Sequence, residues 1–418
     1  MRGGRPGREC GDDKGIQAGA FVRWTEKAAV SAATKTVDHL VIGGGPAGAM
    51  AAIKLAEAGK RVTLVEKEAG AHDKVCGEFL SREAIEYLRG ISISPAELGA
   101  ASIRNVRLSS GGRLAEAELP FQALSLSRRV LDAALLARAA ETRCEVRRGL
   151  AVEGLTPEDG AWCARLCGDE VIRAQNVFLA NGKHDLRGWS RARGKQSDLI
   201  GFKLHWRLTA AQATALRESI ELFLFRGGYG GLSLVEEEAA NLCLVVRRSA
   251  LQRAGGWNAV LAAMLEENVR LRERLRGAEA LYSRPLAISP IPYGYLASQA
   301  RGLWRVGDQA AVIPSFTGDG MSIALHTAAL AAQMCLEGMS ADEYMRVMQR
   351  QLRKPLRLAT WLSRAMVTGS GRACAPAVLA VFPDAMRWIA AATRIPDSAL
   401  LERGCTPSHP GAAAFERS

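Results

Sequence analysis

The sequence predicts an α/β protein in which a parallel-sheet domain is interrupted by an antiparallel β-sheet domain and followed by C-terminal helices. Three observations predict this. A short apolar run, a glycine-rich turn and an Ala-rich helix follow one another around residue 45; alternating strands with paired glycines occupy residues 199–286; and a strand, a glycine-rich turn and a helix return after Gly302. With 418 residues, 48% hydrophobic and 23% charged, the chain has room for two or three domains.

Changes in sequence texture divide the chain into five parts. Residues 1–35 are rich in Gly and Arg and lack the apolar core of a secretory signal, so we expect a disordered basic extension. Residues 36–195 and 291–340 are expected to form the parallel-sheet domain in two pieces. Residues 196–290 form the antiparallel-sheet domain, and residues 341–418 the C-terminal helices.

Composition excludes several classes of protein. The most apolar stretches are broken by His326, Arg364 or Pro376, short of the roughly 20 residues of a membrane span. A net charge of +12 could attract any anionic partner and selects none, and we expect no nucleic acid partner. The 9 cysteines form no Cys-x-x-Cys pair and no zinc-type cluster, which favours a reducing cytoplasm and predicts no metal site.

The first βαβ unit carries a dinucleotide-binding motif. An apolar strand at 37–42 leads into Gly43-x-Gly45-x-x-Gly48, a helix follows through Pro46 and Ala47 to residue 58, and a second strand covers residues 62–65. Glu66 ends that strand 23 residues after Gly43, the place of a ribose-binding acid, with Lys67 beside it. An acid there repels a 2′-phosphate, so the unit favours FAD or NAD over NADP.

Motifs in the second half resemble the flavoprotein superfamily of aromatic hydroxylases and geranylgeranyl reductases. The segment 303–311 contains Gly307-Asp308, and Pro314 precedes Gly318-Asp319-Gly320-Met321 and an Ala-rich helix. The resemblance implies FAD as the cofactor and a Rossmann-type FAD-binding domain. It also implies that Asp308 binds the ribitol and that Gly318, Gly320 and Met321 lie at the pyrimidine edge of the flavin, where a helix N-terminus stabilises the reduced anion.

The same resemblance extends to two earlier segments. Arg128, in the segment 127–132, matches an arginine that reaches the cofactor near its phosphates. The segment 74–81 is similar to the Cys-Gly-Gly loop of geranylgeranyl reductases, which lies beside the flavin ring, and so predicts Cys76 and Glu78 as catalytic residues. Glu78 replaces the second glycine and could bring a carboxylate into the site as a proton donor. A buried, inert thiol is the alternative for Cys76.

Two sequence features distinguish this chain from the aromatic hydroxylases and from the flavin-dependent halogenases. Aromatic hydroxylases carry Ala-Asp-Gly where this chain has Ala180-Asn181-Gly182, so a hydroxylase-type use of NAD(P)H is in doubt, although the nearby Lys183 and Arg187 suit phosphates. The Trp-x-Trp-x-Ile-Pro motif of flavin-dependent halogenases is absent from the sequence.

The remaining segments suggest where a substrate binds. Seven aromatic residues offer an apolar wall in and after the second domain, although most are expected to be core: Phe202, Trp206, Phe223, Phe225, Tyr229, Tyr293 and Tyr295. After Ser340, one helical face carries Met345, Met348, Leu352, Leu356, Ala359, Leu362 and Met366 among basic residues. That face is expected to cap the substrate domain, and the alternative is docking on anionic lipid at the inner membrane surface.

The sequence therefore predicts an FAD-dependent oxidoreductase that exchanges a hydride with an apolar small-molecule substrate, prenyl-like or polyketide-like, with NADH or NADPH as electron donor. One alternative is an FAD-dependent monooxygenase that hydroxylates an aromatic or polyketide substrate. A second is a non-catalytic flavin-binding protein at a membrane surface.

Overall fold

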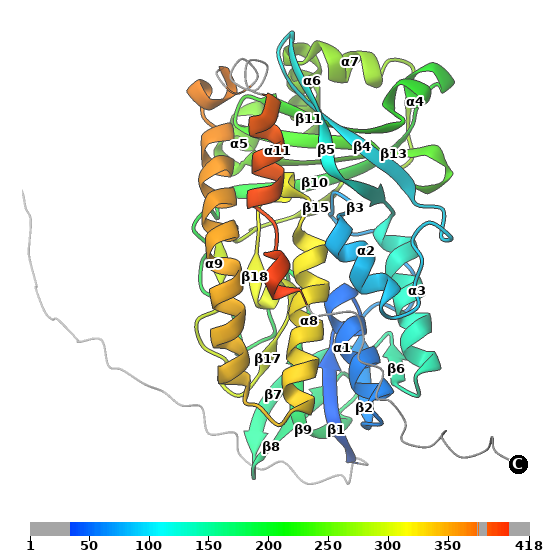
Figure 1. Cartoon of the computed structure of the whole chain (residues 1–418), viewed down its shortest axis with the longest axis vertical. Coiled ribbons are helices and arrows are strands. Elements are labelled where there is room, and N and C mark those ends of the chain that lie inside the picture. The colour runs from blue at the N-terminus through cyan, green and yellow to red at the C-terminus, as the bar shows by residue number, and fades with distance from the viewer. Residues whose placement is uncertain (1–33, 374, 376–382, 401–418) are drawn as a thin grey trace, which may run out of the picture.

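A computed structural model of the chain describes residues 34–373, 375 and 383–400 (Figure 1). The predicted extension at 1–35 lies outside these residues except for its last two, and residues 401–418 of the predicted C-terminal helices also lie outside them. Two sheets occupy opposite ends of the long axis, and helices α8 and α9 run alongside (Figure 1).

The first sheet is the predicted parallel one, extended at one edge by an antiparallel hairpin. Its strands, in spatial order, are β6 (Glu145–Arg148), β2 (Val62–Glu66), β1 (Lys35–Ile42), β9 (Val171–Leu179), β8 (Ala161–Leu166) and β7 (Val152–Glu158). β17 (Trp304–Arg305) adds to β9 in parallel, so the chain returns to this sheet after the second domain. β2 is wholly buried and β1 is buried from His39 to Ile42, as expected for the centre of a sheet covered on both faces.

Helices cover this sheet on the side of the glycine motif. α1 (Pro46–Glu57) contacts both α3 (Arg128–Glu141) and α8 (Gly320–Leu336), while α2 (Arg82–Arg89) contacts α8. The Ala-rich sequence of α1 lets these helices approach closely, because ten of its twelve residues are buried. α1 and α8 both begin at the end of the sheet that faces the second domain (Figure 1).

The second sheet is mixed, whereas an antiparallel sheet was expected. Its strands, in spatial order, are β14 (Glu279–Ala280), β10 (Leu199–Arg207), β13 (Ala239–Arg247), β12 (Gly228–Leu234), β11 (Glu218–Phe225), β4 (Ala101–Ser110), β5 (Arg113–Ser125) and β3 (Phe79–Leu80), with β15 (Leu286–Ile288) on β10. β11 and β4 pair in parallel, and the other pairs are antiparallel. The parallel pair arises because β4 comes from a distant part of the chain.

Residues 79–125, which were expected in the first part of the FAD-binding domain, supply β3, β4 and β5 of the second sheet. The physical reason is edge pairing: the β4–β5 hairpin turns at Gly111, and β4 then adds to β11 through seven residue pairs. Nothing local in the sequence specifies which sheet such a hairpin joins.

Short helices cover the outer face of the second sheet. They are α4 (Ala210–Leu216), α5 (Arg248–Ala254), α6 (Trp257–Glu267) and α7 (Val269–Arg274). α6 and α7 are divided at Asn268, whose side-chain Oδ1 accepts a hydrogen bond from the Leu271 amide at 3.1 Å and so starts α7. Phe202, Phe223 and Phe225 lie in the core beneath these helices, as expected of most of the aromatic residues.

The C-terminal region includes α9 (Ala341–Met366) and α11 (Pro383–Ala392). Met345, Met348, Leu352, Leu356 and Ala359 on the predicted apolar face of α9 are buried, and the cluster they join also contains α1 and α8. This face therefore packs mainly on the first domain, and it is not available to lipid. Among the described residues, no helix is both long and apolar enough to cross a bilayer.

Candidate functional site

The glycine motif forms a tight strand-to-helix turn that opens onto a cavity of about 890 Å³. Gly43 has φ 107°, and a Cβ atom there would lie 2.5 Å from the Ala180 carbonyl oxygen. A Cβ atom on Gly48 would lie 1.8 Å from the Gly43 carbonyl oxygen. Gly43 and Gly48 are therefore fixed as glycine by protein packing, whereas Gly45, Pro46 and Ala47 line the cavity.

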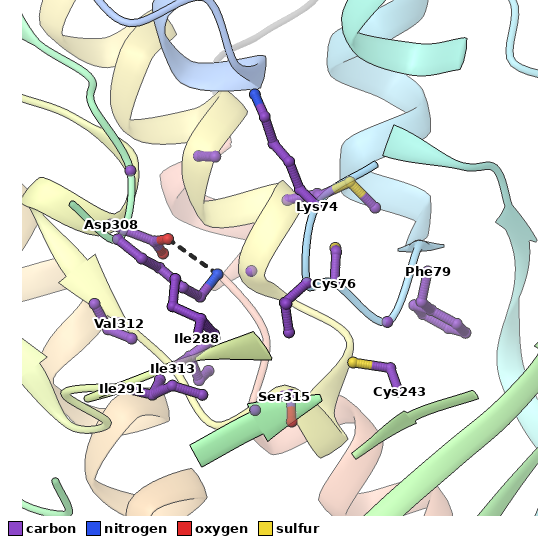
Figure 2. A pocket seen from close by; sticks show the side chains of 18 of the residues that line it. Lys74, Cys76, Phe79, Cys243, Ile288, Ile291, Asp308, Val312, Ile313 and Ser315 are labelled. Atoms are coloured by element: carbon purple, nitrogen blue, oxygen red, sulfur yellow. Dashed lines mark ion pairs between the residues drawn. The ribbon is translucent and has the colours of Figure 1, made fainter. Parts of the chain in front are cut away.

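The two acids expected around the cofactor line the same cavity. Glu66 is buried, and its Oε2 accepts a hydrogen bond from the Gly44 amide at 2.5 Å while Oε1 accepts one from Glu68 at 3.1 Å. Asp308 lies across the cavity from Cys76 and Phe79 (Figure 2). Its Oδ2 is 3.2 Å from the Lys183 ammonium, and this carboxylate raises the pKa of Lys183.

Arg128 begins α3 and extends its guanidinium toward the glycine motif. The Nε and Nη2 atoms donate to the two oxygens of Asp132 at 2.8 Å each, and Lys74 donates to the same carboxylate at 3.0 Å. Burial acts to lower the pKa of Arg128, but the Asp132 carboxylate outweighs it and raises that pKa. A Cβ atom on Gly45 would lie 3.2 Å from Nη2, so the arginine faces the motif directly.

The second glycine-rich turn closes the cavity from the other side. A short 3₁₀ turn, η3 (Ser315–Thr317), ends at Gly318, which has φ 73° and packs so closely on Phe79 that a Cβ atom would lie 2.4 Å from its ring. α8 then begins at Gly320, and Gly318, Gly320 and Met321 line the cavity. The N-termini of α1 and α8 both lack a side-chain cap. Their partial positive charges therefore face one space, which fits an elongated ligand with anionic groups at both ends.

The loop between β2 and β3 brings Cys76 and Glu78 to the cavity wall. Cys76 is half-buried, and its Sγ accepts a hydrogen bond from the Glu78 amide at 3.4 Å. The neighbouring Cys243 of β13 lines the same wall (Figure 2), and burial raises its pKa to about 12. Cys243 was not singled out from the sequence, because a lone cysteine on a strand carries no local signal.

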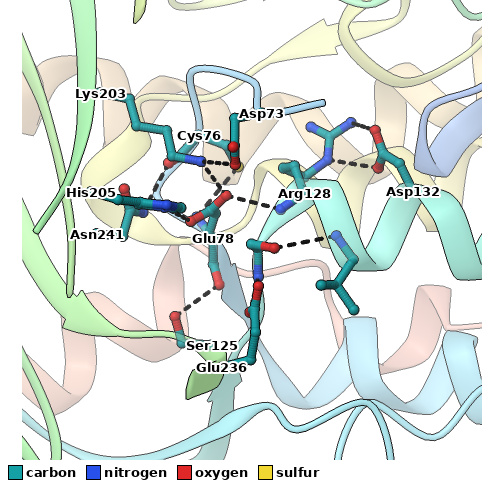
Figure 3. A network of polar contacts seen from close by, with 12 residues as sticks. Asp73, Cys76, Glu78, Ser125, Arg128, Asp132, Lys203, His205, Glu236 and Asn241 are labelled. Carbon is teal, nitrogen blue, oxygen red and sulfur yellow. Dashed lines mark hydrogen bonds and ion pairs between the residues drawn. The ribbon is translucent and has the colours of Figure 1, made fainter. Parts of the chain in front are cut away.

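Glu78 lies deeper than expected. It has φ 59°, is 0% exposed, and its carboxylate is held by Lys203, by His205 Nε2 at 2.9 Å and by the Arg128 amide at 2.9 Å (Figure 3). Both of its oxygens thus take part in hydrogen bonds, so Glu78 belongs to a buried polar cluster, and its catalytic role stays a prediction. Lys203 and His205 were missed, although two polar residues at i and i+2 in an apolar strand were a usable signal.

The Ala-Asn-Gly turn and Lys67 also line the cavity. Asn181 donates from its side-chain nitrogen to the His184 carbonyl at 2.5 Å, and its Oδ1 is buried without a hydrogen-bond partner. Lys67 lies at the exposed rim, where its Nζ atom is 3.6 Å from Glu68 Oε1. Of the seven predicted aromatic wall residues, Tyr229 and Tyr293 line the cavity.

Comparisons with known proteins agree with this geometry. Residues 36–206 match the family described as FAD binding domain. Over 331 residues, the chain is 28% identical to digeranylgeranylglycerophospholipid reductase 2 of Methanopyrus kandleri, covering 73% of this chain and 78% of that protein. It is 26% identical to the menaquinone reductase of Mycolicibacterium smegmatis over 330 residues, with the same two coverages.

Solved structures share the fold. A geranylgeranyl bacteriochlorophyll reductase-like protein of Thermoplasma acidophilum superposes with a TM-score of 0.64 at 20% identity, covering 88% of this chain and 96% of that one. The myxobacterial chondrochloren halogenase superposes with a TM-score of 0.69 at 20% identity, covering 86% and 91%. The relatives by sequence are named reductases and oxidoreductases, so the chain is an enzyme and not a non-catalytic flavin-binding protein. It belongs to the superfamily of FAD-dependent oxidoreductases that contains the geranylgeranyl reductases and the aromatic hydroxylases.

Proposed function

We propose that this protein is an FAD-dependent reductase whose substrate is an apolar, prenyl-like molecule. The observation that carries the proposal is the shape and lining of the cavity, which continues past Cys76 into an arm between the second sheet and the C-terminal helices. Its lining includes Val106, Leu108, Leu119, Ile220, Leu222, Phe316, Leu362, Met366, Met386 and Ile389. Such a surface takes up a hydrocarbon chain favourably, because both surfaces leave water on binding.

The apolar arm is close to electrically neutral. Among the described residues that line it, Arg394 is the charged one, and its Nη1 donates to Glu83 at 2.8 Å and to Asp319 at 3.1 Å. These two acids are almost fully buried and compensate the guanidinium. The arm therefore suits the uncharged part of a substrate better than a phosphate.

The proposed cofactor contacts follow from the cavity walls. The turn at Gly43, Gly45 and Gly48 with Arg128 would hold the pyrophosphate, Glu66 the ribose, Asp308 the ribitol, and Gly318, Gly320 and Met321 the pyrimidine edge. Pro46, Ala47 and Lys67 would border the same path. Bound FAD supplies the hydride of the reaction.

Cys76 is the proposed catalytic side chain at the ring. It lies at the junction of the cofactor side of the cavity and the apolar arm, and it helps to exclude water there. A Cys76→Ala variant should bind FAD normally and reduce substrate more slowly. Normal substrate turnover by this variant would leave Cys76 as a packing residue.

The experiment that tests the reductase proposal is anaerobic reoxidation. Enzyme whose flavin has been reduced photochemically would be mixed, without oxygen, with a menaquinone of short isoprenoid tail or with a geranylgeranyl-bearing glycerolipid. The proposal predicts that the oxidised flavin spectrum returns in proportion to one of these substrates and that the product gains two hydrogens. A flavin that stays reduced with both would contradict the proposed substrate class.

NADH or NADPH is the proposed electron donor. Arg187 is exposed at the rim beside the cavity residue Leu186, where a cation could meet a phosphate. Anaerobic mixing with each nucleotide should bleach the flavin spectrum. Enzyme that neither nucleotide reduces, but that dithionite reduces, would require a protein electron donor instead.

Peripheral contact with a membrane is also proposed, through a different face from the one considered in the sequence. Trp361 on α9 is 66% exposed and lines the cavity, and Trp388 on α11 is 61% exposed. Exposed Arg364 and Arg387 lie near them in the sequence. Tryptophan and arginine together suit an anionic lipid interface. Co-sedimentation with anionic liposomes should fall in the double variant Trp361→Ala/Trp388→Ala, and unchanged co-sedimentation would exclude this face.

A further inference from the structure

Asp73 and Glu78, which line the cavity near Cys76, belong to a polar cluster that also contains Lys203, His205 and Tyr282. Figure 3 shows Asp73, Glu78, Lys203 and His205 together. The Lys203 ammonium is 0% exposed and donates to Glu78 and, at 3.1 Å, to Asp73. Burial acts to lower the pKa of Lys203, but the two carboxylates outweigh it and raise that pKa, so Lys203 keeps its charge.

The other members of the cluster form one hydrogen-bonded chain. The Tyr282 hydroxyl is 2.6 Å from Asp73 Oδ2 and 3.1 Å from His205 Nδ1, and His205 Nε2 is 2.9 Å from Glu78 Oε2. The chain thus contains three hydrogen bonds between four side chains. It runs from Tyr282, which is half-buried, to Glu78, which is fully buried at the cavity wall.

The protons available do not match these bonds. Each hydrogen bond needs one proton, and two ionised carboxylates contribute none. Tyr282 contributes one proton and a neutral imidazole contributes one, which leaves one of the three bonds without a proton. The third proton must lie on His205 or on one of the two acids.

The charges of the cluster lead to the same conclusion independently. Two ionised carboxylates and one ammonium leave a net charge of −1 within a cluster whose Glu78, Lys203 and His205 are buried. An uncompensated buried charge is costly, and one additional proton makes the cluster neutral. Proton count and charge therefore require the same additional proton.

We infer that this cluster is a proton store, which holds one exchangeable proton in the cavity wall and releases it as the substrate is reduced. The inference rests on the proposed function for its role in turnover. When a C=C bond is reduced, one carbon takes the hydride and its electron pair from reduced cofactor, which is oxidised, and the other carbon takes a proton. That proton leaves the hydrogen bond between Glu78 and His205, and solvent replaces it through Tyr282.

The stored proton can be observed without turnover. The flavin-bound, substrate-free enzyme would be examined at neutral pH by ¹⁵N NMR of the His205 ring and by infrared difference spectra of wild type against Glu78→Gln. The inference predicts either a doubly protonated His205 or a protonated carboxyl group in wild type. It predicts a neutral His205 in Glu78→Gln, because a glutamine amide can itself donate to Nε2. A neutral His205 beside two ionised carboxylates in wild type would overturn the inference.

The path to solvent is tested by a matched pair of tyrosine variants. Tyr282→Phe removes the phenol that connects His205 to the half-buried end of the cluster and should lower kcat about tenfold or more, with KM and FAD content unchanged. Tyr87→Phe is the control, because the Tyr87 hydroxyl also lies against a histidine, 2.7 Å from His326 Nδ1, but Nε2 of that histidine bonds Gln351 and not an acid of the cluster. Equal kcat values for the two variants would exclude the path through Tyr282.

These outcomes remain separate from the reductase proposal. If the enzyme reduces no apolar substrate, the proposed function fails, but the spectroscopic count of protons still tests the proton store by itself. If substrate is reduced but His205 and both acids lack the additional proton, the proton store is wrong and the reductase proposal is unaffected.

Discussion

At the residue scale, Gly45 lies directly before α1 and faces the Arg128 guanidinium. Gly45→Val should abolish FAD binding, because a Cβ at this position already lies 3.2 Å from Nη2 and the branched side chain would fill the space proposed for the pyrophosphate. The measurement is flavin absorbance of the purified protein after incubation with FAD. Gly154→Val in β7 is the control, because a Cβ there meets nothing within 4 Å and the cavity is elsewhere. Normal flavin content in Gly45→Val would reject the assignment of this turn.

Asp308 offers a more graded test. Asp308→Ala should weaken FAD retention without unfolding the protein, since it removes one or two ribitol hydrogen bonds worth roughly 0.5 to 1.5 kcal/mol each. It also leaves Lys183 without its carboxylate. Equilibrium dialysis of FAD would give the change in Kd, and Asp308→Asn, which keeps an acceptor oxygen, should lose less. Equal FAD affinity in wild type and Asp308→Ala would make this aspartate purely structural.

Glu78 shows which features of a single residue's surroundings could be predicted from the sequence. Its replacement of a glycine predicted a carboxylate at the Cys76 loop, and a carboxylate is there. Its partners could not be predicted, because Lys203 and His205 lie more than 120 residues away on β10. The backbone of Glu78 is left-handed, with φ 59°, and this conformation costs a non-glycine residue about 1 kcal/mol or more.

At the scale of elements, Arg394 joins three helical segments that are distant in sequence. It follows α11, binds Glu83 of α2 and Asp319 at the start of α8, and lies 3.6 Å over the Phe121 ring. Burial raises the pKa of Asp319 to about 7, although Arg394 acts to lower it. The C-terminal wall of the apolar arm is thus connected to the proposed flavin turn by one buried ionic cluster.

The raised pKa of Asp319 predicts how stability changes with pH. The folded protein holds a proton on Asp319 up to about pH 7, whereas the unfolded chain releases it near the ordinary aspartate pKa of 3.8, so this group makes stability fall as pH rises between those values. The slope from one group is at most about 1.4 kcal/mol per pH unit. Asp319→Asn should remove this contribution, so its Tm relative to wild type should rise from pH 5 to pH 8. Asp397→Asn, at an exposed acid paired with Arg82, is the control. Parallel Tm curves for wild type and Asp319→Asn would contradict the prediction.

Helices and strands differ in how well the sequence predicts them. The βαβ unit was placed within a few residues, because a continuous apolar run, a glycine turn and an Ala-rich helix are local signals. The C-terminal helix was also placed, but its apolar face packs mainly on α8 and not mainly on the second domain. Which surface covers an apolar face is a tertiary property, and the same holds for the hairpin β4–β5.

At the scale of the whole molecule, the cavity lies where the two sheets and the C-terminal helices meet. One side comes from the ends of β1, β2 and β9, another from β10, β12 and β13, and the apolar arm from β4, β11, α9 and α11. The motifs predicted the cofactor side, because each has a fixed local sequence. The apolar arm could not be predicted, since its residues come from separate elements and form no pattern along the chain.

The central claim is that reduced flavin passes its hydride to an apolar substrate and does not insert oxygen into it. The most direct measurement is mass spectrometry of the product that the reduced enzyme forms from a menaquinone or geranylgeranyl substrate, in parallel reactions without oxygen and under ¹⁸O₂. The reductase account predicts the same product in both, heavier by two hydrogens and free of label. Product that forms only with oxygen and carries ¹⁸O would contradict it and establish the monooxygenase instead.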